Sequence, residues 1–130
     1  MIRGLLIISL CSVSSPLQAC DLAGASRIGL DGAATMLYRI KSPPFAVAQH
    51  FAMQFRFCRG EQSLTVKRFE LDALMPAHNH AMNYRARIDI LDDGLIEASG
   101  LLFHMPGQWQ VVVDVEYGGT AQQLKIDYQI

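Results

Sequence analysis

Two short segments of the chain hold most of its histidine and methionine side chains. Three of the four histidines and three of the six methionines fall within residues 75–83 and 103–107. The members of these segments are Met75, His78, His80, Met82, His104 and Met105. Copper accepts both imidazole nitrogen and thioether sulfur, and the soft sulfur favours Cu(I). The clustering therefore indicates a metal site, with copper as the favoured ion.

The spacing in the first segment supports this hypothesis. His78, His80 and Met82 stand two residues apart, so an extended backbone would direct all three side chains to one face. Neither segment contains a carboxylate, which argues against calcium or magnesium. Zinc accepts three histidines but has little use for methionine. We therefore expect His78, His80, Met82 and His104 as ligands, with Met75 and Met105 as additional soft donors.

A structural explanation of the same residues stays open. Methionine commonly fills gaps in a core. Met75, Met82, Phe103 and Trp109 could close one end of the fold, while His78 or His104 donates hydrogen bonds to loop carbonyls. The fourth histidine, His50, begins a predicted strand, and we interpret it as structural or exposed.

The elements that must position these loops are strands. Side chains alternate between apolar and polar along several stretches, and no helical period survives after the first twenty residues. This pattern predicts strands at residues 36–41, 51–57, 64–73, 84–90, 108–115 and 123–130, with another after the turn at residues 92–94. Met36 and Tyr38 are expected on the buried face of the first strand and Leu37 on its solvent face. Tyr84, Ala86, Ile88 and Ile90 are expected to form another buried face.

Local signals refine the strand pattern. The apolar positions change parity within residues 64–73, so we expect a β-bulge near Lys67 and Arg68. Residues 92–94 and the pair Gly118 and Gly119 are typical of hairpin turns. About seven short strands predict an all-β fold, an immunoglobulin-like antiparallel β-sandwich.

The first nineteen residues are typical of a signal peptide. Arg3 precedes a short apolar run at residues 4–13, and a cut after Ala19 follows the usual small-residue pattern. We therefore expect a signal peptide at 1–19, one domain at 20–130 and export to the periplasm. The net charge of −1 offers no electrostatic footprint for nucleic acid.

Two cysteines would remain after that cut. Cys20 and Cys58 would pair in an oxidising compartment, closing a loop whose restriction contributes roughly 3–4 kcal/mol. The alternative is a lipoprotein, because residues 17–20 loosely match a lipobox in which Cys20 is acylated. The protein would bind a membrane only in that second case.

The paired motifs also resemble a known group of proteins. Residues 75–84 (MPAHNHAMNY) and 100–109 (GLLFHMPGQW) are similar to the YtkA-like and FixH-like group of small exported bacterial domains, over roughly residues 50–117. Ala81 departs from the motif, which often has glycine after the second histidine. The resemblance implies an immunoglobulin-like sandwich outside the cytoplasmic membrane. Some relatives are associated with copper proteins or with cytochrome oxidase assembly.

These observations favour a binding module over an enzyme. The sequence contains neither a nucleophile turn nor a phosphate-binding loop. The leading hypothesis is a periplasmic carrier or assembly accessory for copper, with a copper acceptor or a cytochrome-related protein as partner. The alternative is a non-catalytic interaction domain of the envelope, whose histidine and methionine loops are structural.

Overall fold

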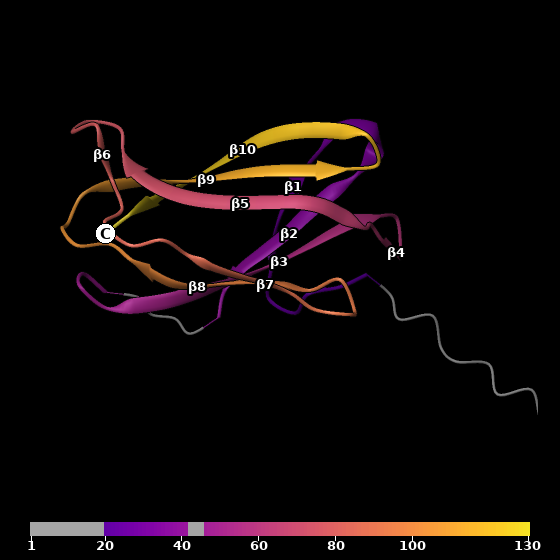
Figure 1. The fold of residues 1–130 in the computed structure, drawn as a ribbon, viewed down its shortest axis with the longest axis horizontal. Coiled ribbons are helices and arrows are strands. Elements are labelled where there is room, and N and C mark those ends of the chain that lie inside the picture. The colour runs from indigo at the N-terminus through magenta and orange to yellow at the C-terminus, as the bar shows by residue number, and fades with distance from the viewer. Residues whose placement is uncertain (1–19, 42–45) are drawn as a thin grey trace, which may run out of the picture.

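Two antiparallel sheets face each other across one apolar core (Figure 1). The computed structural model describes residues 20–41 and 46–130, and the predicted signal peptide lies outside them. The predicted all-β sandwich is confirmed. The described residues form ten strands and one short 3₁₀ turn. Three of these strands were not predicted, because they are too short to show alternation: β1 (Ser26–Gly29), β4 (Gln62–Ser63) and β6 (His80–Ala81).

The first sheet has the order β1-β2-β3-β8-β7, with β4 paired to one end of β3. Its longer members are β2 (Thr35–Ile40), β3 (His50–Arg59), β7 (Arg87–Ile90) and β8 (Ile96–Leu102). The predicted turn at residues 92–94 joins β7 to β8. Gly94 adopts a φ of 81° there, and Leu91 N donates to Leu95 O at 2.8 Å.

The second sheet has the order β10-β9-β5-β6, built on β5 (Val66–Met75), β9 (Gln108–Tyr117) and β10 (Thr120–Gln129). Its predicted bulge is present. The β5–β9 register shifts between Val66 and Arg68, which returns Phe69 and Ala73 to the core. An extra residue in one strand reverses the parity of every later side chain. Gly118 and Gly119 form the predicted tight turn between β9 and β10.

The core is made by the inward side chains of both sheets. The largest fully buried members are aromatic or long: Trp109, Tyr117, Phe55, Phe57, Phe103, Met36 and Met53. Phe103 stacks on Trp109 with ring centroids 4.9 Å apart. These contacts form at the end of the sandwich where β8 passes into β9, so they fix the second histidine-containing loop.

Two predictions about strand faces are wrong. Leu37 was expected in solvent but is only 1% exposed, because Leu22 and Cys58 form a second small cluster with it on the outer face of the first sheet. Tyr84 and Ile90 were expected to be buried but are 49% and 52% exposed. The reason is that β7 begins only at Arg87 and lies at the edge of its sheet.

The predicted disulfide is present between Cys20 and Cys58, whose Cα atoms are 5.8 Å apart. It holds residues 20–25 against the outer face of the first sheet, next to Leu37. A thioether-linked lipid would need the same Cys20 sulfur, so the lipoprotein alternative cannot coexist with this bond. No helix in the described part of the chain is long and apolar enough to cross a bilayer. A small disulfide-bonded β domain is typical of an exported protein.

Candidate functional site at one end of the sandwich

The two histidine-containing segments meet at one end of the molecule. The turn after β5 and the loop before β9 lie together on the left of Figure 1, beside the C-terminus. Backbone hydrogen bonds join Gly107 to Ile130 in both directions, at 3.2 and 3.0 Å. The cause is strand order: β5 and β9 are antiparallel neighbours, so the end of one lies next to the start of the other.

His80 and His104 are the histidines that this arrangement brings together. Their ring centroids are 6.1 Å apart, and the rings are inclined by 67°. The other side of His104 makes an edge contact with Trp109, at 5.1 Å between centroids. His104 Nδ1 is buried and has no hydrogen-bond partner among the described residues. A buried nitrogen without a partner is uncommon, and an absent ion or water is one usual explanation.

His78 does not share an extended face with the other two expected ligands. Residues 76–79 form a turn in which His78 N donates to Met75 O at 3.2 Å and Asn79 adopts a φ of 49°. The extended backbone starts only at His80. His78 and His80 are both exposed. His78 therefore lies in the turn, outside the extended stretch that carries His80.

The methionines differ from one another. Met75 is 1% exposed and Met82 is 8% exposed, so both sulfur atoms belong to the core. Met82 Sδ accepts a hydrogen bond from Leu102 N at 3.3 Å. Met105 is half-buried, and its carbonyl accepts a hydrogen bond from Trp109 Nε1 at 3.0 Å. Met105 is therefore the most accessible thioether of the three.

Most of the aromatic and thioether groups at this end serve the fold. Met75, Met82, Phe103 and Trp109 are all buried, as the structural explanation requires. Among the described residues, no group of three or more His, Cys, Asp or Glu side chains could hold a metal ion. A metal here would rest on two imidazoles and a thioether. His50 begins β3 opposite Leu102 and makes an edge contact with Tyr84, at 5.2 Å between ring centroids.

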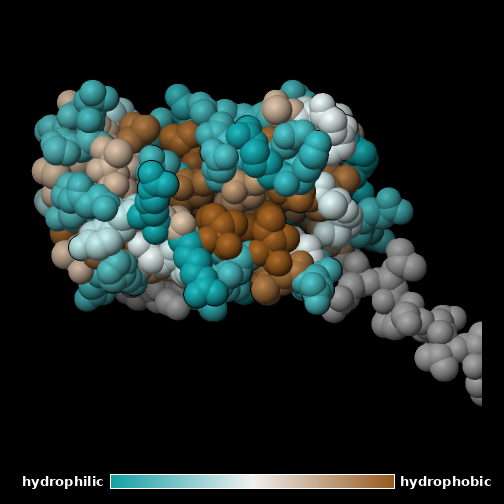
Figure 2. Space-filling model, in the orientation of Figure 1, coloured by the Kyte–Doolittle hydropathy of each residue, from teal (hydrophilic) through white to brown (hydrophobic). Residues whose placement is uncertain are grey.

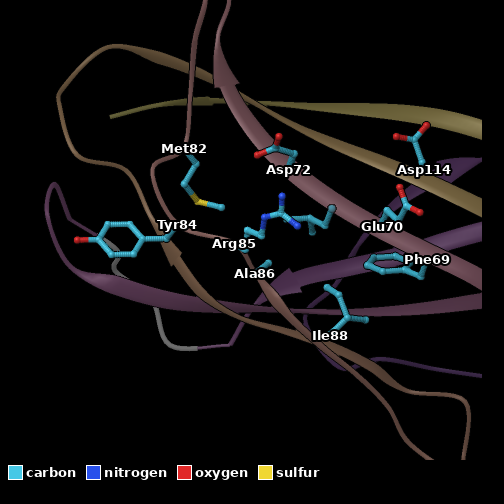
Figure 3. Close-up of a pocket in the computed structure, with 10 residues that line it drawn as sticks. Phe69, Glu70, Asp72, Met82, Tyr84, Arg85, Ala86, Ile88 and Asp114 are labelled. Atoms are coloured by element: carbon cyan, nitrogen blue, oxygen red, sulfur yellow. The ribbon is translucent and has the colours of Figure 1, made fainter.

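A second feature was not expected from the sequence. A hollow of about 520 Å³ opens between β5 and β7, the facing strands of the two sheets (Figure 3). Phe69 and Ile88 lie on its apolar side, while Arg85 extends toward the carboxylates of Asp72 and Glu70. Strand order creates this hollow, and alternation within a single strand carries no information about strand order.

Comparison with known proteins places the chain in a structural class, a small two-sheet antiparallel β-sandwich. The solved structure of a DUF4426 family protein from Pseudomonas aeruginosa PAO1 is similar over 82% of this chain and 94% of its own, with a TM-score of 0.61. The sequence identity is 11%, so the similarity concerns the fold alone. No family model and no curated protein matches the chain.

Proposed function

We propose that this protein is an exported copper-handling module that holds Cu(I) between His80 and His104 and passes it to a partner in the periplasm. The observation that carries the proposal is the pairing of these two rings, since the His104 ring has a buried nitrogen that forms no hydrogen bond with any described residue. The sequence resemblance to YtkA-like and FixH-like domains agrees with such a role. It is a carrier role with no catalytic step.

The separation of the two rings suits a shared ion. A metal about 2 Å from one nitrogen of each imidazole places the ring centroids roughly 5–6.3 Å apart, from a tetrahedral to a linear angle at the metal. The observed 6.1 Å lies at the wide end of this range, which favours a nearly linear arrangement. A small movement of the exposed His80 side chain would complete the geometry.

The donor set favours the reduced ion. Cu(II) prefers four nitrogen or oxygen ligands in a tetragonal arrangement, whereas soft sulfur selects Cu(I). Met105 is half-buried at this end of the sandwich and supplies the accessible thioether, and His78 lies in the adjacent turn. Met82 stays in the core and is not a ligand in this proposal, because its sulfur already accepts a hydrogen bond from the amide of Leu102. A site with exposed ligands allows exchange of the ion to an acceptor.

An anaerobic competition titration with a coloured Cu(I) chelator tests the proposal. We expect one tight equivalent of Cu(I), and His80→Ala should weaken it at least about tenfold, the loss of roughly 1.4 kcal/mol of binding free energy. His80 is exposed, so this variant should fold normally. The double variant of His78→Ala and His80→Ala should abolish tight binding.

Three further variants locate the site. His50→Ala removes a histidine outside the pair and should leave the affinity unchanged. Met82→Leu keeps the volume of a buried side chain and should also leave it unchanged, whereas Met105→Leu should weaken binding. Unchanged binding in the His80 variant and in the double variant would place the copper elsewhere.

A non-catalytic interaction domain of the envelope is the second candidate. The burial of Met75, Met82, Phe103 and Trp109 favours it, since these residues of the conspicuous loops pack in the core. If wild-type protein binds no Cu(I) in the titration, this second function replaces the first.

A further inference from the structure

The side of β5 that faces away from β9 is an open sheet edge over most of its length. β6 covers this side only at Leu74 and Met75, and Met82 N donates to Ala73 O at 2.7 Å. Among the described residues, no strand pairs with this side nearer the start of β5. Alternate residues direct their backbone N–H and C=O groups to the same side of a strand. Phe69 and Leu71 therefore present theirs where Ala73 does, without a neighbouring strand.

The chain compensates for the missing neighbour at one position. The backbone N–H of Ala73 donates to the side chain of Asp72, with a distance of 2.7 Å to Oδ1. A side chain of this kind replaces a strand by satisfying one edge group locally. Exposed edges without such protection are templates for pairing with another chain. Phe69 and Leu71 thus offer unsatisfied ladder positions.

An apolar groove runs beside this edge. The hollow of about 520 Å³ is bordered by Phe69, Leu71 and Ile88, and a second hollow of about 280 Å³ follows along the same two strands at Val66 and Ile90. Figure 2 shows hydrophobic surface between polar rims in the region where Figure 1 places β5 and β7. Tyr84, Ile90 and Leu91 are three of the four large hydrophobic residues exposed within the described ranges.

The polar rim of the groove is acidic. The two hollows are lined by five carboxylates and one basic side chain: Glu70, Asp72, Asp92, Asp93, Asp114 and Arg85. Arg68 and Arg56 form ion pairs with Glu70 and Asp93. Three carboxylates remain, those of Asp72, Asp92 and Asp114. Together with Arg85 they leave the lining with a net charge of −2. A segment that carries lysine or arginine beside apolar residues complements this lining.

We propose that an extended, basic segment of a partner protein adds as a strand to the open edge of β5. Its alternate apolar side chains fill the groove toward β7, and its basic side chains reach Asp72 and Asp114, two of the carboxylates without an arginine ion pair. Addition of a strand supplies main-chain hydrogen bonds for affinity, while pockets for alternate side chains give specificity. The open stretch at residues 66–72 spans roughly 20 Å, long enough for six or seven residues of an extended partner.

A second copy of this chain is a poorer occupant of the groove. Two-fold symmetric pairing of β5 edges would bring the same carboxylates from both copies together. Glu70 already lies opposite Asp114 across β5 and β9, a like-charge pair that is unfavourable within one chain. A partner of opposite charge relieves this repulsion, whereas a second copy increases it.

Selection from a phage library of random twelve-residue peptides, with the purified protein as bait, tests the proposal. Enriched peptides should alternate apolar residues with lysine or arginine. Binding measured by fluorescence anisotropy should weaken about tenfold in Glu70→Arg. This variant creates an opposite-charge pair with Asp114, so the fold should be retained. Asp127→Arg on β10 makes the same charge change at the far edge of that sheet and should bind like wild type.

Amide exchange measured by NMR then locates the bound peptide. Protection of the Phe69 and Leu71 amides, and loss of binding when proline replaces a central peptide residue, support strand addition. The proposal is overturned if no peptide is enriched, if enriched peptides are acidic, or if they protect amides near His80 instead. It is also overturned if the protein alone forms a dimer in sedimentation and these amides are already protected in that dimer.

Discussion

At the scale of single residues, Gly107 controls the loop that carries His104. It adopts a φ of 135°, and a Cβ atom added there would lie 2.7 Å from Met75 Cε. Met75 Cε is the flexible end of a buried side chain, so the positive φ of Gly107 is the stronger of the two restraints. The backbone of Gly107 also forms hydrogen bonds with the backbone of Ile130 in both directions. The loop is therefore held by one glycine between a core methionine and the C-terminus.

Replacing that glycine should destabilise the whole domain. Gly107→Ala combines strained backbone with a steric overlap, and we expect the free energy of unfolding to fall by about 1–3 kcal/mol. Denaturant unfolding followed by Trp109 fluorescence measures it. Gly29→Ala is the matched control, because its φ is not positive and nothing lies within 4 Å of the new Cβ. It should change the free energy by less than about 0.5 kcal/mol. Equal stability of both variants would contradict the assigned role of Gly107.

The candidate ligands show what residue types alone can predict. The sequence singled out two segments, and these segments meet at one end of the sandwich. It could not distinguish Met82, whose sulfur faces the core, from Met105, which is half-buried. Both stand in short segments that also contain proline and histidine. The direction of a side chain in a loop depends on where the turn ends. Here the turn occupies residues 76–79, and the extended backbone begins at His80.

At the scale of elements, the parity of apolar residues predicted most of the sheet structure. The bulge near Lys67 and Arg68 was visible because Leu64 and Val66 occupy the opposite parity to Phe69. The burial of Leu37 was not visible, because it depends on a cover supplied by residues 20–25. Alternation describes one strand at a time, whereas a cover on the outer face depends on the path of a distant segment.

The disulfide should be essential for holding residues 20–25 over Leu37 on the outer face of the first sheet. Replacing Cys20 and Cys58 together with serine removes a restriction on the unfolded chain, and we expect the free energy of unfolding to fall by about 3–4 kcal/mol. Residues 20–25 should then become the first site of limited proteolysis, since the bridge is their covalent tie to β3. Denaturant unfolding and mass mapping of early fragments provide the measurements. An unchanged midpoint would mean that Leu22 and Leu37 hold the segment without the bond.

At the scale of the whole molecule, strand order decides which surfaces remain open. β5 and β7 lie in different sheets and face each other across the groove, although each reads as an ordinary half-buried strand in sequence. The acidic lining is assembled from β5, β9 and the β7–β8 turn. The sequence contains these residues at separate positions with no shared motif. The groove could therefore be found only from the assembled sandwich.

Stability of the whole sandwich should decline in alkali through its buried tyrosines. Burial, with a smaller effect of Tyr38, raises the pKa of Tyr128 to about 12, and burial also raises the pKa of Tyr117. Because the folded pKa exceeds the unfolded value of about 10, this contribution is complete below pH 10 and is lost as pH rises toward 12. We expect the free energy of unfolding to fall by roughly 1–2 kcal/mol through Tyr128 over that window.

Denaturant unfolding at pH 8, 10 and 11.5 measures this decline. Tyr128→Phe lacks the ionisable hydroxyl and should lose less stability than wild type between pH 10 and 11.5. Tyr84→Phe is the matched control, because Tyr84 is 49% exposed and should follow the wild-type curve. Identical slopes for all three proteins would show that Tyr128 ionises freely while folded. That outcome would imply that β10 opens in alkali before the rest of its sheet, since Tyr128 pairs with Trp109 in the β9–β10 ladder.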